Sequence, residues 1–180
     1  MVSLSLFTVV MLATISSLLI VNDASRKVQS MRAVMDNLNF AVEAMSRTIR
    51  TGSEYICDAG NTGPNVSCPF ADGNPADSIR VRSEESTPGN DIYVDFRLGS
   101  AGGVGVLERQ RTVGGVPTGW QAMTSSEIDV QELQFYVDGA ETSDLTQPSV
   151  TLFIKGTAAT NSTQVAPFSI QTKISQRTIE

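Results

Sequence analysis

Two cysteines, Cys57 and Cys68, are the residues whose chemistry is easiest to assign in this chain. They bracket a loop rich in glycine, proline, asparagine and aspartate, and neither belongs to a Cys-x-x-Cys motif or to a zinc-ligand spacing. We predict a disulfide between them in an oxidising compartment, which would fix the shape of the loop. Two free thiols in a reducing compartment are the alternative.

Acid–base catalysis has little support in the composition, because the chain contains no histidine. Histidine is the commonest general base and the usual activator of a serine or cysteine nucleophile. The acidic residues Glu84, Glu85, Asp91 and Asp95 are more typical of a solvated face than of an acid/base pair. We therefore expect no enzymatic activity and no catalytic residue. An enzyme that works with carboxylates alone is the remaining catalytic alternative.

Sites for ions and ligands are equally sparse. Asp58, Asp72 and Asp77 fall in predicted loops and offer oxygen ligands that calcium prefers, but they lack the EF-hand spacing. The glycine-rich residues 102–105 lie between predicted strands, which indicates a turn and not a phosphate-binding loop. The net charge is −6, and no aromatic residues interleave with the scattered basic ones. We expect no cofactor, no metal and no nucleic-acid partner.

Residues 2–21 carry no charge, and as a helix they would span about 30 Å, the thickness of a bilayer core. The stretch lacks the basic start and the small-residue cleavage site of a signal peptide. Small hydroxyl residues, which let helices approach closely in lipid, dilute its hydropathy at Ser3, Ser5, Thr8, Thr14, Ser16 and Ser17. We predict a membrane helix that also packs against other helices. An ordinary single-pass anchor is the alternative.

The helical pattern continues without a break to about Arg50, and its second half is amphipathic. Apolar residues recur there at gaps of three and four, namely Val28, Met31, Met35, Leu38, Val42, Met45 and Ile49. A helix with such a stripe must bury it. We predict that the stripe lies on a following sheet and that the helix stops near Gly52. A coiled coil is the alternative.

The remainder of the chain predicts short strands separated by turns. The expected strands are residues 78–81, 91–98, 104–111, 128–137, 150–155 and 168–176. Glycine-rich residues 99–103, residues 112–119 and the stretch after residue 155 are expected to be turns or loops. The predicted fold class is therefore α+β, with one long N-terminal helix packed on an antiparallel β-sheet.

The predicted organisation has three parts. Residues 1–22 form the transmembrane or assembly half of the helix, residues 23–51 its amphipathic half, and residues 52–180 a globular β domain. Arg26, Lys27 and Arg32 follow the apolar run, which by the positive-inside rule favours a cytoplasmic location for that flank. The predicted disulfide favours the opposite side. We give more weight to the disulfide and expect the globular domain outside the cytoplasm.

Four segments resemble a known family. The start VSLSLF at residues 2–7, followed by an apolar run, resembles the N-terminal helix of type IV pilins and type II secretion pseudopilins. The helix end MSRTIRTG at residues 45–52 resembles that of the J-type minor pseudopilins and their minor-pilin relatives. The segment LQFYV at residues 133–137 and the closing strand at residues 170–177 also fit that subgroup.

The resemblance implies a pilin-like fold and a structural function in a type II secretion or type IV pilus-like filament. The apolar helix would sit in the bacterial inner membrane as a single pass before assembly and in the filament core afterwards. The implied partners are other pilin or pseudopilin subunits, which pack through this helix, and the membrane itself. A membrane-anchored extracytoplasmic binding module that does not polymerise is the alternative function.

One part of the family pattern is missing from these residues. The prepilin signature has a glycine before the cleavage point, a phenylalanine after it and a glutamate a few residues further on. Met1 corresponds to a position several residues inside the mature helix. A start codon assigned too late, a trimmed chain and a degenerate relative would each produce this pattern. No residue is therefore assigned to cleavage, N-methylation or docking.

Overall fold

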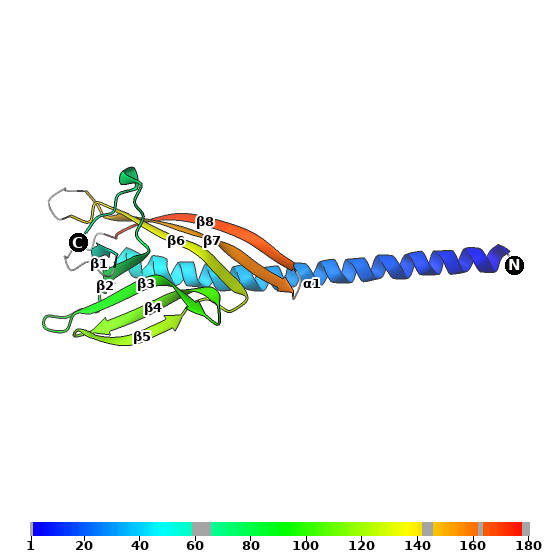
Figure 1. The fold of residues 1–180 in the computed structure, drawn as a ribbon, viewed down its shortest axis with the longest axis horizontal. Helices are drawn as coiled ribbons and strands as arrows, with labels where there is room; N and C mark the ends of the chain where they lie inside the picture. The colour runs from blue at the N-terminus through cyan, green and yellow to red at the C-terminus, as the bar shows by residue number, and fades with distance from the viewer. Residues whose placement is uncertain (1, 59–65, 142–145, 162–163, 178–180) are drawn as a thin grey trace.

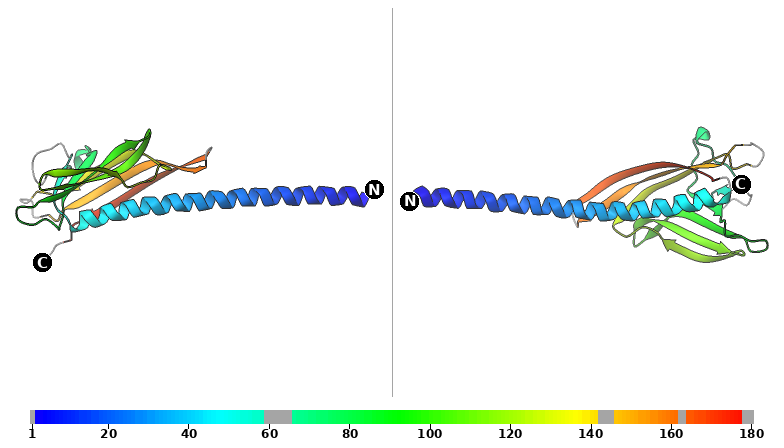
Figure 2. Two further views of the ribbon diagram at one scale, coloured as in Figure 1. Left: turned by 90° about the horizontal axis from the view of Figure 1, so that it is seen from below. Right: turned by 180° about the vertical axis from the view of Figure 1, so that it is seen from behind.

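A computed structural model of the chain describes residues 2–58, 66–141, 146–161 and 164–177. One long helix, α1 (Val2–Thr51), precedes a region of antiparallel strands, so the fold class is α+β (Figure 1). The first half of α1 projects away from the body of the molecule, and the strands lie beside its second half (Figure 1). The views in Figure 2 show the strands lying along this half of the helix.

The helix is continuous because residues 2–51 contain neither glycine nor proline. Its 50 residues correspond to a length of about 75 Å. It stops at Gly52, whose backbone N–H still donates to the Thr48 carbonyl at 3.0 Å. A Cβ atom at position 52 would lie 2.2 Å from Cγ1 of Val81, so no other residue fits here without displacing its neighbours. The predicted helix stop is therefore also a close-packing site.

The strands form two antiparallel sheets, where the sequence predicted one. The five-stranded sheet has the order β1-β2-β3-β4-β5, and the three-stranded sheet has the order β6-β7-β8. The bounds of the first are β1 (Ser53–Cys57), β2 (Ser78–Arg82), β3 (Ile92–Ala101), β4 (Val104–Val113) and β5 (Val116–Ala122). Those of the second are β6 (Ile128–Asp138), β7 (Ser149–Asn161) and β8 (Gln164–Ser175). A short 3-10 helix, η1 (Phe70–Asp72), lies between β1 and β2.

Several segments differ from the sequence prediction. Strand β1 was not expected, and β3 continues to Ala101, into residues predicted to be a turn. Strands β7 and β8 continue through residues 156–161 and 164–167, which were predicted to be a loop. Strands β4 and β5 together occupy most of residues 112–119, which were predicted to be a turn. Only Gly114 and Gly115, both at positive φ, make that turn, which joins β4 to β5. Pro117 is tolerated because β5 is an edge strand.

The second half of α1 packs on β7 and β8. Its fully buried residues are Val34, Leu38, Ala41, Met45 and Ile49, and Met31, Met35 and Val42 pack beside them. The predicted stripe is therefore wrong at Val28, which is 52% exposed, and it omitted Val34 and Ala41. A straight α-helix has 3.6 residues per turn, so an apolar stripe predicted with a strict 3.5-residue period drifts away from the buried face of the helix.

Candidate assembly surface and the end that anchors it

No part of the chain that the structure describes covers the first half of α1. The span Ser3–Asn22 has a mean hydropathy of 2.4, and none of it is buried. By length and composition, this helical span is long enough and apolar enough to cross a membrane. Its large exposed side chains are Leu4, Leu6, Phe7, Val9, Val10, Met11, Leu12, Ile15, Leu18, Ile20 and Val21. Contiguous exposed apolar surface of this kind is typical of sites that contact membranes or other proteins.

The hydroxyl groups in this segment bond back to the helix itself. Thr8 donates to the Ser5 carbonyl at 2.8 Å, and Ser16 donates to the Leu12 carbonyl at 2.9 Å. Such bonds remove the cost of placing a free hydroxyl in hydrocarbon. The small polar residues are therefore compatible both with lipid and with close packing against a second helix.

Beyond this span, one large aromatic side chain stays on the outer side of the helix. Phe40 is 74% exposed, although Leu38 and Ala41 beside it are fully buried. Asp36 and Glu43, one turn before and one turn after it, are also exposed. Within the described part of the chain, neither carboxylate has an ion-pair partner. Phe40 thus continues the uncovered surface of α1 into the half that carries the sheets.

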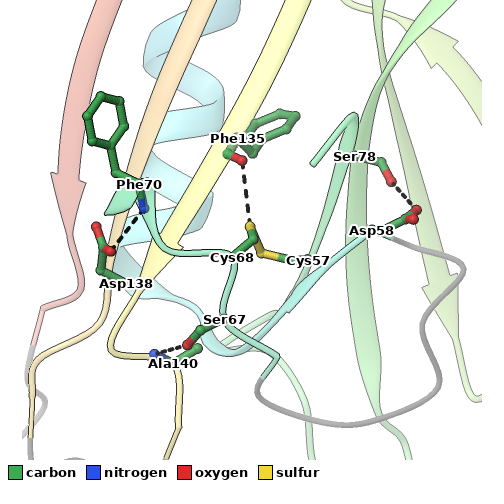
Figure 3. The surroundings of a disulfide bond; sticks show 9 residues. All are labelled: Cys57, Asp58, Ser67, Cys68, Phe70, Ser78, Phe135, Asp138 and Ala140. Atoms are coloured by element: carbon green, nitrogen blue, oxygen red, sulfur yellow. Dashed lines mark hydrogen bonds between the residues drawn. A yellow bond between two sulfur atoms is a disulfide. The ribbon is translucent and has the colours of Figure 1, made fainter. Parts of the chain in front are cut away.

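The disulfide between Cys57 and Cys68 is present in the structure (Figure 3). Cys57 is the last residue of β1, in the five-stranded sheet. Cys68 exchanges two backbone hydrogen bonds, each 3.0 Å long, with Val137 of β6 in the three-stranded sheet. The disulfide therefore links the two sheets at the end of the molecule where α1 stops. Most of the loop it closes, residues 59–65, lies outside the described residues.

The carboxyl end of α1 is held by hydrogen bonds from β1 and from the residue that follows β8 by two positions. The hydroxyl of Tyr55, which is buried in β1, lies 2.7 Å from the Ile49 carbonyl and 3.0 Å from the Gly52 carbonyl. The backbone N–H of Arg177 donates to the Arg50 carbonyl at 2.7 Å. Burial raises the pKa of Tyr55 well above its usual range. These bonds satisfy carbonyls that a helix end otherwise leaves without partners.

The acidic residues expected on a solvated face divide into two groups. Glu84, Glu85 and Asp91 are exposed. Asp95 is only 1% exposed and binds Arg80 at 2.5 Å, so the prediction of a solvated carboxylate is wrong there. Asp95 lies on β3 directly opposite Arg80 on β2, and the side-chain hydrogen bond between them raises the pKa of Arg80. The pair is a structural element of the five-stranded sheet.

Asp58, Asp72 and Asp77, the loop residues with oxygen ligands that calcium prefers, all lie between β1 and β2. Among the described residues, no three acidic, cysteine or histidine side chains gather as metal ligands, and this includes Asp58, Asp72 and Asp77. Gly102 and Gly103, both at positive φ, form a two-residue turn between β3 and β4.

Comparison with protein-family models, curated proteins and solved structures finds no match to this chain. Its function is therefore inferred from two features of its own geometry. One is the uncovered apolar half of α1, and the other is the disulfide-linked double sheet that holds the opposite half.

Proposed function

We propose that this chain is a pilin-like structural subunit, a minor pilin or pseudopilin of a type II secretion or type IV pilus-like filament. The observation that carries the proposal is the division of α1 into two halves within one unbroken helix. The second half is buried against β7 and β8, whereas the span Ser3–Asn22 is bare. A subunit built in this way can exchange lipid for the helices of its neighbours without changing its own fold.

The hydroxyl-rich composition of the bare half supports assembly in addition to anchoring. In lipid, apolar surface alone gives helices no reason to associate, and close packing through small residues provides most of the attraction. Thr8, Thr14 and Ser16 supply such small surfaces with their hydroxyls already bonded to the helix backbone. A helix that served only as an anchor would gain nothing from them.

The exposed Phe40 supports the same proposal from outside the membrane span. It lies 18 residues beyond Asn22, which places it about 27 Å further along the helix. Lipid cannot cover an aromatic side chain at that distance if Ser3–Asn22 fills the bilayer core. A neighbouring subunit that packs along α1 would cover both surfaces.

The disulfide supports a location of the globular part outside the cytoplasm, because disulfides persist in oxidising compartments. We therefore place α1 in the inner membrane as a single pass before assembly, with both sheets on the extracytoplasmic side. Partners of the proposed subunit are other pilin-like subunits that pack through α1.

A Leu12→Asp variant tests this proposal. Leu12 lies at the middle of the bare span and is 67% exposed, so the substitution leaves the folded core untouched. A charge at the centre of a membrane helix costs about 3 kcal/mol in insertion experiments. We expect loss of membrane retention and of co-purifying subunits, with the disulfide still formed. Unchanged retention and unchanged co-purification would contradict the proposal. A Leu12→Ser control should keep both.

A further inference from the structure

The edge of β6 that faces the five-stranded sheet is covered at both ends. Phe135 exchanges two backbone hydrogen bonds with Ala76, each 2.9 Å long, and Val137 exchanges two with Cys68, each 3.0 Å long. Near the start of β6, the backbone N–H of Gly105 donates to the Asp129 side chain at 2.9 Å. A Cβ atom at Gly105 would lie 2.0 Å from the Val130 carbonyl oxygen, so β4 is pressed directly against this end.

Leu133 lies between these two covered ends. Backbone groups alternate sides along a strand, so Leu133 turns its N–H and C=O to the same edge as Phe135 and Val137. The segment that pairs with Phe135 does not continue past Ala76, because the chain enters β2 at Ser78 and pairs with β3 instead. Across the described residues, no hydrogen bond reaches Leu133 from that side.

A pocket of about 420 Å³ occupies this gap. Its walls are Asp77 and Ser78 on one side, Arg97 and Leu98 of β3 on the second, and residues 131–134 of β6 on the third. Ligand pockets in proteins typically measure about 300–1,000 Å³. We name this pocket the wedge, because it opens where the two sheets diverge.

The charges around the wedge leave one carboxylate without a partner. Glu132 binds Lys155 at 2.7 Å, and Arg97 binds Glu108 at 2.9 Å. Asp77 is exposed and has no ion-pair partner among the described residues. A ligand in the wedge would therefore meet an unpaired backbone N–H and C=O, the apolar side chain of Leu98 and one free negative charge.

We propose that the wedge binds an extended peptide segment of a partner protein, about three residues long. The backbone of its central residue pairs with Leu133, and a lysine or arginine beside it faces Asp77. Addition of a strand to a sheet edge with unpaired backbone groups is a common mode of peptide recognition, in which the main chain supplies affinity and side chains supply specificity. The wedge lies between the sheets and not on α1, so this proposal does not depend on the assembly of α1.

Hydrogen exchange of the full chain in detergent micelles tests the free edge. Leu133, Phe135 and Val137 are buried residues of one strand, so their amides form a matched set. We expect the Leu133 amide to exchange at least about tenfold faster than those of Phe135 and Val137, because it has no protein acceptor. Equal protection of the three amides would overturn the proposal.

A library of immobilised pentapeptides tests recognition with the same protein preparation. Two positions of the peptide are varied, and each of them carries every amino acid in turn. We expect the selected peptides to contain a basic residue and to slow hydrogen exchange at the Leu133 amide. N-methylation of the peptide residue that pairs with Leu133 should weaken binding about tenfold. Asp77→Lys should weaken binding about fivefold, whereas Asp72→Lys, on η1, should not change it. Absence of any selected peptide, or equal binding by the Asp77→Lys variant, would refute the site.

Discussion

The Tyr55 hydroxyl lies 2.7 Å from the carbonyl oxygen of Ile49, so the first strand after α1 reaches back to the last turn of the helix. Both residues are buried, at 1% and 0% exposure. The contact fixes the direction in which α1 leaves the sheets. In the proposed assembly, that direction determines where the bare half of the helix is presented to a neighbouring subunit.

Tyr55→Phe should lower stability at neutral pH and flatten its decline in alkali. Losing the hydroxyl leaves a buried carbonyl without its donor, a cost of about 1–3 kcal/mol. In the unfolded chain tyrosine ionises near pH 10, whereas burial raises the pKa of Tyr55 in the folded protein. The unfolded state thus binds fewer protons above about pH 10, and the free energy of unfolding falls as pH rises.

Denaturant titrations of wild type and Tyr55→Phe in detergent, at intervals from pH 7 to pH 11, measure both effects. Part of the alkaline decline should persist in the variant, because the pKa of Tyr93 is also raised, first by burial and then by its hydrogen bond to Glu54. Curves that stay parallel above pH 10 would show that Tyr55 makes no contribution to the decline.

Removing the disulfide should destabilise the double sheet. The double variant Cys57→Ser/Cys68→Ser is expected to lose about 2–3 kcal/mol of unfolding free energy, as the chain-entropy model gives for a short loop. Urea titration measures the loss. Reductant added to the wild type should reproduce it and should leave the double variant unchanged. A wild type that is insensitive to reductant throughout the titration would contradict a stabilising role.

Arg80→Ala should cost far more than truncation of an exposed arginine. The substitution leaves the buried carboxylate of Asp95 without its charged partner. We expect a loss of about 2 kcal/mol of unfolding free energy, at the low end for a buried ion pair because Arg80 itself is partly exposed. Arg111 pairs with Glu85 at an exposed site, so Arg111→Ala should change stability by no more than about 0.5 kcal/mol. Equal losses in thermal or urea unfolding would mean that the Asp95 carboxylate is effectively solvated.

Substitutions at Leu38 and Phe40 should distinguish an effect on folding stability from an effect on assembly. Leu38 is 0% exposed, so Leu38→Ala should lose about 2–5 kcal/mol of stability. Phe40→Ala should change stability by less than about 0.5 kcal/mol, because that side chain is exposed. It should nevertheless reduce co-purification of neighbouring subunits. Full co-purification with Phe40→Ala would remove this residue from the proposed interface.

Much of the architecture is readable from residue pattern alone. The absence of glycine and proline before Gly52 predicts one helix, and strict alternation predicts strands such as that of Phe168 and Ile174. The predicted stripe was wrong at Val28 because the 3.5-residue period was extended toward the N-terminus, past the part of α1 that the sheets cover. Ala41 was omitted because its small side chain gives little periodic signal.

The features that the sequence did not reveal depend on contacts between distant segments. Asp95 is buried because Arg80 lies opposite it on a neighbouring strand, which only the strand register shows. The wedge at Leu133 exists because the chain changes sheets between Ala76 and Ser78. No local pattern encodes that divergence. The cysteine pair was predictable because turn residues between the two positions bring them together.

Site-specific photo-crosslinking at Leu12 in membranes of the producing cells tests the central claim most directly. A photoreactive residue at this exposed position touches whatever covers the bare half of α1. The same residue at Val165, exposed at the start of β8, serves as the control on the globular part. Assembly predicts crosslinked species of two or more subunits from position 12, and fewer from position 165. Crosslinks from position 12 to lipid alone would contradict assembly and leave α1 as a membrane anchor.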